Sequence, residues 1–561
     1  LRRLTSGQMA AEFLDRAGVP YLVGIPGHGN IAFLDAFRNH PNIQVLMPRH
    51  EQSAVHLADG YYRVTGHPLA CYTSIGPGAL NTAVGLGTAF VDSTAVLVFT
   101  GDAHTYMFGK GVLQEIERHH SANFPRVMEP LVKRYWQVTR PEQLPGVLSR
   151  AWNEMMTGRR GPVLIDLPMD VQAADAEVVI PDPKLHEPVG RVQPDPVQVE
   201  RAAQLLLKAK RPVITVGGGV LASGAWQELK EVAELVGAAV LTTMNAKGAF
   251  PADHPLSGLV GGSKGTDCGN YLARAADVVL AVGCRFADET TSSYRKGVTY
   301  NFPETKLIHI DIDPGEIGKN YPTDIGIVAD AATGLAHLLA ALRQYRSTYD
   351  YLNATYTQEI TRLRNEWWDS LQFAKDDRVP VTISRFLREL RGALRRDAIV
   401  AHSSGNAQAA ILSEFPFYEP RTNLTTGGMS TMGFAYPAAL GAKLAHPERQ
   451  VVAVVGDGDF LMTMQEMAFA AQYDIPVVCC VLNNIGWLAI KDLQLDVYGE
   501  EHDFAVEFLR NGKPYTPHFA NVAKEFDLYA ERIEAPHEVQ PAIQRALASG
   551  RPALVEVMVN R

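Results

Sequence analysis

The stretch Val451–Trp487 constrains the fold of this chain more than any other. It reads VVAVVGDGDFLMTMQEMAFAAQYDIPVVCCVLNNIGW. A short apolar run is followed by the glycine turn Gly456–Gly458, a helix-forming segment and a second apolar run that ends at Asn483–Asn484. This order predicts a strand, a tight turn, a helix and a second strand.

Both strands of such a unit run in the same direction, so Asp457 and Asn484 should lie together at the carboxyl edge of a parallel sheet. A carboxylate and an amide oxygen are hard ligands suited to Mg²⁺, which keeps phosphate oxygens and water as its other ligands. Gly458 lets the backbone approach a diphosphate, and the helix N-terminus after it favours negative charge. An ordinary strand–helix turn with an acidic cap is the alternative explanation for Gly-Asp-Gly alone.

The bulk properties of the chain exclude several classes of function. Its 561 residues are enough for about three or four domains, each with its own core. The net charge of −9 and the absence of a Lys/Arg run argue against a nucleic-acid or membrane partner. Five cysteines are few and odd in number, which is typical of reduced thiols. No segment approaches the roughly 18 apolar residues of a membrane helix, so we expect a soluble cytoplasmic protein.

Apolar strands alternate with helical segments along most of the chain. This alternation predicts an α/β fold made of three doubly wound parallel-sheet domains, which we expect over residues 1–180, 190–342 and 370–561. The segment Pro181–Glu200 has five prolines and reads as a linker between the first two domains. The charged helical stretch 343–378 reads as a connector before the third.

The 24 residues between Gly458 and Asn483, in a strand–helix–strand context, resemble the GDG…NN motif of the thiamine diphosphate enzymes. The segments RHEQSAVHLADGYYRVTG (Arg49–Gly66) and TTGGMSTMGFAYPAALGAKLA (Thr425–Ala445) extend the likeness. The whole chain resembles the acetohydroxyacid synthase and pyruvate oxidase branch of that family. The resemblance implies a pyrimidine-binding first domain, a central domain of the FAD-binding type and a third domain for diphosphate and Mg²⁺. It also implies a homodimer or homotetramer with active sites between subunits.

Within that family a glutamate bonds N1′ of the pyrimidine, and the resemblance gives this role to Glu51. The cofactor must lose a weakly acidic C2 proton, and a carboxyl at N1′ promotes the tautomer whose amino group acts as the base. On sequence alone, Glu51 is simply a solvated or capping residue at the start of a helix. Met432 matches the apolar residue that holds the cofactor bent, with a core methionine as the alternative.

The resemblance implies two further sets of ligands. The thiamine diphosphate contacts are Glu51, Ser74, Gly76, Ser404, Gly405, Asn406, Ser430, Met432, Gly456, Asp457, Gly458, Asp459 and Asn484. The metal ligands are Asp457, Asn484 and the main-chain oxygen of Gly486.

The middle block resembles the family's FAD domain through short segments such as VGGGV (Val216–Val220) and VGCRFADETT (Val282–Thr291). Phosphates need glycine backbone and a cation. A structural glycine turn is the alternative, since no GxGxxG is present, and such an FAD is often structural rather than reactive. The implied FAD contacts are Gly218, Gly219, Thr242, Arg285, Asp311, Asp330 and, from the first block, Gln114.

The segment GIPGHGN (Gly24–Asn30) separates this chain from acetohydroxyacid synthases, which usually have small residues at the position of His28. An imidazole there can move protons near neutral pH, although a surface histidine on a glycine turn is the alternative. The string resembles the thiamine diphosphate enzymes that hydrolytically open cyclohexane-dione rings, with cyclohexane-1,2-dione hydrolase as the nearest activity. His104 and His119–His120 compete for the same role.

We therefore expect hydrolytic C–C cleavage of a cyclic 1,2-dione carbonyl substrate, with Glu51 and His28 as the catalytic residues. Cyclohexane-1,2-dione would give 6-oxohexanoate, and the resemblance allows a later NAD-linked oxidation to adipate, although no NAD site is recognised. The alternatives are an acetolactate synthase or a 2-oxoacid decarboxylase. A non-catalytic cofactor-binding interaction protein is the alternative from another class.

Overall fold

Two compact units make up the chain in the computed structural model, which describes residues 1–116, 124–187, 190–499 and 502–560. Three six-stranded sheets, one in the first unit and two in the second, form their frameworks. The predicted α/β fold of three parallel-sheet domains is therefore confirmed. The first unit contains Leu1–Val189, Gly428–Glu448 and Leu461–Ile475, and the second contains Gly190–Gly427, Arg449–Phe460 and Pro476–Arg561.

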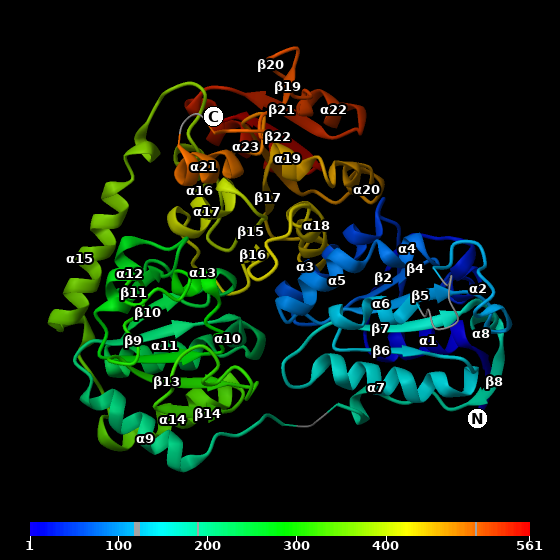
Figure 1. The fold of residues 1–561 in the computed structure, drawn as a ribbon, viewed down its shortest axis with the longest axis horizontal. Coiled ribbons are helices and arrows are strands. Elements are labelled where there is room, and N and C mark those ends of the chain that lie inside the picture. Colours follow the sequence, from blue (N-terminus) through cyan, green and yellow to red (C-terminus); the bar gives the residue numbers. More distant parts are fainter. Residues whose placement is uncertain (117–123, 188–189, 500–501, 561) are drawn as a thin grey trace. The chain divides into compact units, whose positions relative to one another are not determined.

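The sheet of the first unit has the strand order β3-β2-β4-β5-β7-β6, and each neighbouring pair is parallel. Helices cover both of its faces (Figure 1), so β4, β5 and β7 are buried along their whole length and read as apolar runs. The strands are β2 (Tyr21–Gly24), β3 (Gln44–Leu46), β4 (Ala70–Thr73), β5 (Leu97–Asp102), β6 (Arg134–Gln137) and β7 (Val163–Pro168), with an antiparallel pair β1 (Arg2–Thr5) and β8 (Asp175–Val178). The helices are α1 (Ser6–Arg16), α2 (Ile31–Asp35), α3 (Glu51–Thr65), α4 (Pro77–Leu80), α5 (Ala83–Val91), α6 (Phe124–Met128), α7 (Leu144–Met156), α8 (Met169–Ala173), α18 (Ala435–Ala445) and α20 (Met467–Gln472).

Helices α3 and α18 of the first unit touch through their backbones. A Cβ added to Gly60 would lie 2.2 Å from the main-chain oxygen of Ala438. A Cβ added to Gly441 would lie 2.0 Å from the main-chain oxygen of Leu57. Any larger residue at either glycine would force the helices apart. The helix that begins with Glu51 is therefore packed directly on a segment from late in the chain.

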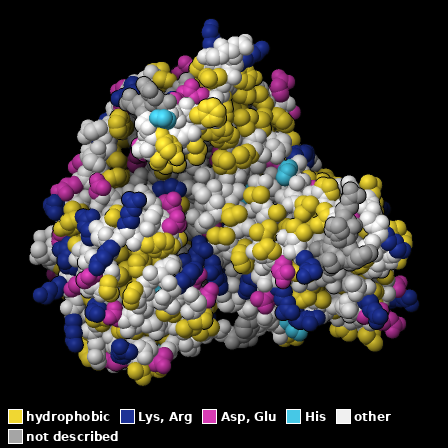
Figure 2. Space-filling model, viewed as in Figure 1, with side chains coloured by type: hydrophobic (Ala, Val, Ile, Leu, Met, Phe, Trp, Pro, Cys, Tyr) yellow, Lys and Arg dark blue, Asp and Glu magenta, His cyan; other side chains and the backbone are white. Residues whose placement is uncertain are grey.

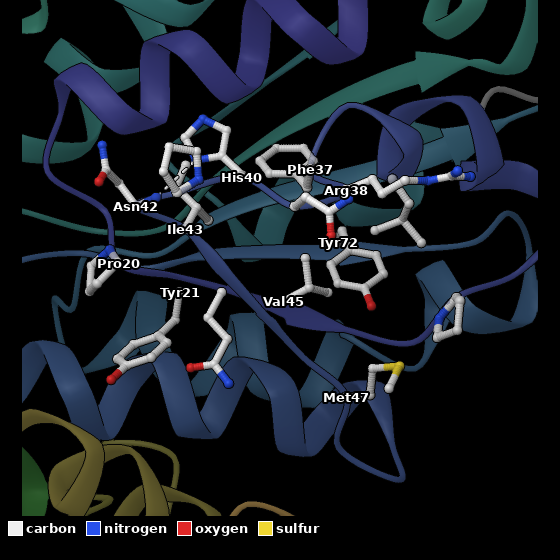
Figure 3. A pocket seen from close by; sticks show the side chains of 15 residues that line it. Pro20, Tyr21, Phe37, Arg38, His40, Asn42, Ile43, Val45, Met47 and Tyr72 are labelled. Atoms are coloured by element: carbon white, nitrogen blue, oxygen red, sulfur yellow. Dashed lines mark hydrogen bonds between the residues drawn. The ribbon is translucent and has the colours of Figure 1, made fainter.

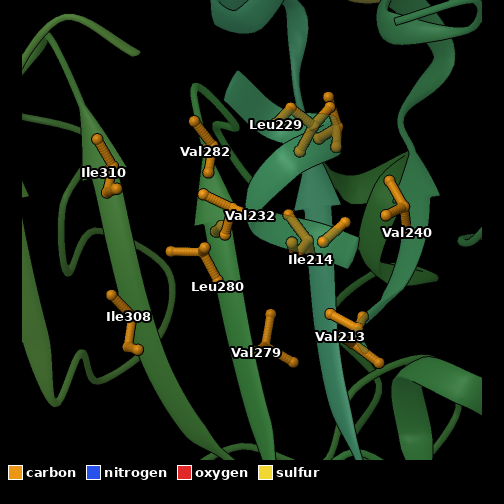
Figure 4. Packing of buried hydrophobic residues seen from close by; sticks show 14 of the residues in the cluster. Val213, Ile214, Leu229, Val232, Val240, Val279, Leu280, Val282, Ile308 and Ile310 are labelled. Carbon is orange, nitrogen blue, oxygen red and sulfur yellow. The ribbon is translucent and has the colours of Figure 1, made fainter. Parts of the chain in front are cut away.

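The central sheet belongs to the second unit and has the order β11-β10-β9-β12-β13-β14, again with parallel neighbours. Figure 4 shows its core, in which Val213 and Ile214 of β9 lie beside Val279 and Leu280 of β12, with Val232 of α11 above them. The strands are β9 (Pro212–Val216), β10 (Ala239–Thr242), β11 (Ser257–Val260), β12 (Val278–Val282), β13 (Lys306–Asp311) and β14 (Ile325–Val328). The helices are α9 (Pro196–Lys208), α10 (Gly218–Ser223), α11 (Trp226–Val236), α12 (Asp267–Arg274), α13 (Asp288–Thr291), α14 (Ala331–Tyr345) and α15 (Thr355–Ser370).

The third sheet, also in the second unit, has the order β16-β15-β17-β18-β22-β21 and parallel neighbours. The strands are β15 (Ile399–His402), β16 (Asn423–Thr425), β17 (Val451–Gly456), β18 (Val478–Asn483), β21 (Tyr529–Ile533) and β22 (Ala553–Met558), and a hairpin pairs β19 (Leu509–Arg510) with β20 (Lys513–Pro514). The helices of the second unit around it are α16 (Ile383–Ala393), α17 (Asn406–Glu414), α19 (Asp457–Phe460), α21 (Leu488–Tyr498), α22 (Phe519–Glu525) and α23 (Pro536–Ala548).

The strand orders locate one candidate ligand edge on each sheet. Numbered in its own chain order, the first sheet and the third both read 2-1-3-4-6-5, whereas the central sheet reads 3-2-1-4-5-6. The direction of the connections therefore reverses between β2 and β4, between β9 and β12, and between β15 and β17. In open parallel sheets, ligands bind beyond the carboxyl ends of the strands at such reversals.

The mixed charges on the surface and the free cysteine thiols agree with what the composition predicts. On the face shown in Figure 2, Lys and Arg side chains are interspersed with Asp and Glu. All five cysteines are buried free thiols. Within the described part of the chain, no helix is both long enough and apolar enough to cross a membrane.

Candidate functional site

The carboxyl edge of the third sheet brings Asp457 and Asn484 together, as the sequence predicts. Strands β17 and β18 are parallel neighbours, with Gly456 paired to Leu482, so both polar residues follow at the same edge. The first residue of the asparagine pair has a structural function, because Asn483 is buried and its amide donates to Glu556 at 2.9 Å.

Three oxygens converge at this edge. The side-chain oxygen of Asn484 is placed 3.2 Å from Oδ1 of Asp457 and 3.1 Å from the main-chain oxygen of Gly486. If the amide were turned over, its nitrogen would donate to both oxygens. With the oxygen inward, the spacing matches that of neighbouring ligands around Mg²⁺, which are about 3 Å apart when each lies about 2.1 Å from the ion. The residues therefore fit a magnesium ion, and these are the three predicted metal ligands.

The electrostatics of Asp457 also suit a cation. Its side chain is buried, and desolvation raises its pKa to about 6 even though backbone N–H groups, including that of Gly486 at 3.2 Å, favour the carboxylate. A divalent ion would supply a positive charge that stabilises this buried carboxylate.

Gly458, in the glycine turn, has a packing role that the sequence does not predict. A Cβ on Gly458 would lie 2.2 Å from Cζ3 of Trp487, so the indole ring requires glycine there. A Cβ on Gly456 would meet nothing within 4 Å, which leaves that backbone open to approach. The predicted long helix after the turn is also broken, into α19, the 3-10 turn Met464–Glu466 and α20.

A second loop shares this edge. The residues Ser404, Gly405 and Asn406 follow β15, which pairs with β17 across the reversal of the third sheet. Gly405 has a φ of 100° and nothing near its Cβ position, and Asn406 donates to Asp492 at 2.7 Å. The two predicted diphosphate loops therefore face each other at the reversal, and the buried Asp459 lies in the one that follows β17.

In the first unit, His28 and Ser74 follow β2 and β4, on either side of the reversal. The N–H of Gly29 donates to Oγ of Ser74 at 3.2 Å, and the main-chain oxygen of Gly29 accepts from Gln172 at 2.7 Å. The buried Asn30 closes the same turn. The loop is thus held rigidly while the ring of His28 is exposed.

The loop after β4 also contacts Gln114. Gly76 has a φ of 52°, and a Cβ there would lie 1.8 Å from the main-chain oxygen of Gln114. A predicted FAD contact thus touches a predicted thiamine diphosphate contact within the first unit, whereas the other predicted FAD contacts belong to the second unit. Of the competing histidines, His104 lies just before a turn at Thr105–Met107, and His119–His120 lie outside the described residues.

Glu51 begins α3 and is buried. Its Oε2 accepts from the side-chain amide of Asn81 at 3.0 Å, a partner not predicted from the sequence, although Asn81 lies only a few residues after the predicted contacts Ser74 and Gly76. Ser430, with a φ of 50°, and the half-buried Met432 flank Thr431, whose hydroxyl bonds that of Thr88 at 2.7 Å. These residues all belong to the first unit, whereas Asp457, Asn484 and Gly486 belong to the second.

The central sheet gives two of its three loop glycines a packing role. A Cβ on Gly217 would lie 1.9 Å from the main-chain oxygen of Gly283, and one on Gly219 would lie 2.7 Å from its Cα. Gly218 would meet only Asn245, at 3.9 Å, so it alone has space for a ligand.

The other predicted FAD residues of this unit lie at, or just after, the carboxyl ends of strands of the central sheet. Thr242 and Asp311 end β10 and β13 and are buried, and Arg285 follows β12. Asp330 already has two structural partners, because it caps α14 through the N–H of Ala332 at 3.0 Å and pairs with Arg191 at 2.8 Å.

A pocket of about 660 Å³ lies along the outer edge of the first sheet, beside β3. Phe37, Arg38, Val45, Met47 and Tyr72 line part of it (Figure 3). None of its lining residues is a predicted site residue, so this cavity lends no support to the assignments above.

The chain is similar to known proteins over essentially its whole length. Family models of thiamine pyrophosphate enzymes match it over residues 4–122 (N-terminal TPP binding domain), 199–338 (central domain) and 403–557 (C-terminal TPP binding domain). A probable acetolactate synthase large subunit of Methanocaldococcus jannaschii is 36% identical, over 98% of this chain and 90% of the relative. The acetolactate synthase large subunit of Corynebacterium glutamicum is 34% identical over 100% of this chain and 87% of the relative, and isozyme 3 of Escherichia coli is 33% identical over 100% and 96%.

These relatives overturn the predicted reaction. Hydrolytic cleavage of a cyclic dione rested on the few residues around His28, whereas the identity to proteins named acetolactate synthase extends over the full chain. The prediction of a dione hydrolase is wrong, and the synthase alternative is favoured. A histidine in one exposed turn is too local a signal to decide the reaction of a whole enzyme.

Proposed function

Because the chain belongs to the thiamine diphosphate-dependent enzymes of the acetohydroxyacid synthase type, we propose that it is an acetolactate synthase. In this reaction one pyruvate loses CO₂, and its remaining two-carbon unit is joined to the keto carbon of a second pyruvate, giving acetolactate. The observation that carries the proposal is the 36% identity over 98% of the chain to a relative of that name.

The proposed roles of the chain's own residues follow from the geometry. Thiamine diphosphate, when bound, supplies a nucleophilic carbon and then an electron sink. Asp457, Asn484 and the main-chain oxygen of Gly486 would hold Mg²⁺ against the diphosphate. Glu51 would hold a proton at the pyrimidine N1′, and its bond from Asn81 at 3.0 Å keeps the carboxyl in one orientation. His28, exposed at the edge of the first sheet, is the proposed proton donor or acceptor toward the substrate.

The remaining contacts stay part of the proposal. Met432 would support the bent cofactor, and Gly218 would admit the phosphates of a structural FAD at the central sheet. We retain the domain boundaries 1–180, 190–342 and 370–561. We also propose a homodimer as the smallest active form, with Glu51 of one copy acting beside Asp457 of the other.

Incubation of the protein with pyruvate, thiamine diphosphate, Mg²⁺ and FAD tests the proposal. We expect acetolactate, measured as acetoin after acid decarboxylation, with one CO₂ per acetolactate. The variant Glu51→Gln keeps the size of the side chain and should abolish the product. Release of acetaldehyde and CO₂ without acetolactate would instead identify a decarboxylase, and no consumption of pyruvate would refute both.

A further inference from the structure

A buried carboxylate lies just ahead of the helix that carries Glu51. Glu466, at the end of the 3-10 turn Met464–Glu466, is 0% exposed. Its Oε1 and Oε2 accept from the backbone N–H of Arg49 at 3.1 and 3.0 Å. The backbone of His50 also favours its charged form. Arg49 and His50 immediately precede Glu51 in the chain.

Two neighbouring contacts tie the same two segments together. The guanidinium of Arg49 donates to Oε1 of Gln472 at 2.5 Å, and the backbone N–H of Met47 donates to the hydroxyl of Tyr473 at 3.1 Å. The residues from Glu466 to Tyr473 therefore hold the chain that enters α3. We call this segment the α3 clamp.

The carboxylate is a costly group to place here, so its position calls for an explanation. Burial raises the pKa of Glu466 to about 7, although the N–H of Arg49 and its positive charge act against this. A neutral side chain could fill the same space without the cost of desolvating a charge. What a carboxylate supplies, and an apolar side chain does not, is two acceptor oxygens for the backbone N–H of Arg49, which precedes the N-cap residue His50.

Glu51 is the first residue of that helix, so its direction is set by the backbone that Glu466 holds. From this geometry we propose that Glu466 is a positioning residue, which fixes the first turn of α3 so that the Glu51 carboxyl meets the cofactor in one orientation. The inference rests on the proposed role of Glu51. It assigns Glu466 no contact with the substrate or the cofactor.

The test compares Glu466→Gln, which keeps the shape but loses one acceptor, with Glu466→Asp, which keeps the carboxylate on a shorter stem. In the loaded enzyme, the rate of deuterium exchange at C2 of thiamine diphosphate measures the step that Glu51 serves. We expect Glu466→Gln to slow this exchange and kcat by about tenfold or more, since small misplacements of a catalytic group are that costly. The KM for pyruvate should stay within about twofold, and Glu466→Asp should be intermediate.

A readout without cofactor makes the positional effect visible by itself. In the unloaded protein, amide hydrogen exchange of residues 49–53 should become faster in Glu466→Gln while the rest of α3 is unchanged. Tyr473→Phe is the matched control. It removes from the α3 clamp the hydroxyl that accepts from the N–H of Met47, a residue four positions before Glu51, and should slow C2 exchange far less.

The outcomes separate the two claims. If Glu51→Gln does not slow C2 exchange, the proposed role of Glu51 fails. If Glu51→Gln slows it but Glu466→Gln and Glu466→Asp do not, only the positioning role is refuted. If Glu466→Gln is unstable, Glu466→Asp serves as the test variant. A wild-type rate of C2 exchange in Glu466→Asp, together with unchanged amide protection, would count against the inference.

Discussion

The first and third sheets have the same strand order, 2-1-3-4-6-5, but their edges carry different chemistry. At the carboxyl ends of β17 and β18, beside the reversal of the third sheet, Asp457 and Asn484 present hard oxygens that fit a metal ion. At the reversal of the first sheet, Gly29 and Ser74 hold a turn that exposes the imidazole of His28. The common order decides where a ligand can approach, and the side chains beyond the strand ends decide which part of it can bind.

Among the variants at the edges of the sheets, the largest effect should come from removing the Asp457 carboxylate at the carboxyl edge of the third sheet. Asp457→Ala removes the only carboxylate among the three convergent oxygens, so we expect Mg²⁺-dependent binding of thiamine diphosphate to be lost and activity to fall by at least about 100-fold. Calorimetric titration measures the binding. Asp496→Asn removes one exposed charge from α21 and should bind normally. If both variants bound thiamine diphosphate equally well, the edge of the third sheet would not differ from that of the first as a metal site.

The clamp predicts a pH-dependent change in stability. The pKa of Glu466 is raised to about 7, so its contribution to stability is present below its unfolded pKa and is lost as the pH rises through 7. The amide in Glu466→Gln does not titrate. We therefore expect the wild type to lose about 3 kcal/mol relative to this variant between pH 4.5 and 7.5, measured by urea unfolding. A constant difference would mean that Glu466 is not desolvated as the structure indicates.

The two glycines of the third edge should respond differently to alanine. A Cβ at Gly458 would collide with Trp487, so we expect Gly458→Ala to destabilise the protein by about 1–3 kcal/mol. Gly456→Ala has free space and should change the unfolding free energy by less than about 0.5 kcal/mol, while weakening binding of thiamine diphosphate. Thermal unfolding with and without the cofactor separates the two. Rescue of Gly458→Ala by Trp487→Ala would identify the indole ring as the cause.

The smallest effect is expected at the central sheet, where Asp330 already caps α14. Asp330→Ala should cost about 1 kcal/mol through loss of this cap, with the absorbance of bound FAD retained. Loss of the flavin spectrum from a stable variant would instead show that Asp330 is needed to bind FAD.

The fold was predictable because its signals are local and repeated. Buried parallel strands read as apolar runs, and the turn residues between them follow the strand ends, which is why Asp457 and Asn484 were expected together. Contacts between distant segments were not predictable from the same signals. The helix expected after Gly458 is interrupted where Glu466 bonds the backbone of Arg49, 417 positions away in the chain. Two further cases are the indole of Trp487 against Gly458 and the amide of Asn81 on Glu51. The spacing of these residues in the sequence does not predict either contact.

The backbone contact between α3 and α18 bears on how the gene for this protein can be divided. The first unit is completed by Gly428–Glu448 and Leu461–Ile475, which lie beyond the whole central sheet in the chain. A fragment that stops at the proline-rich linker would lack α18, leaving Gly60 and the surrounding face of α3 in water. We expect such a fragment to aggregate, whereas co-expression with the remainder of the chain should restore it. The first unit therefore needs these later segments of the chain in order to fold, even though it has a sheet of its own.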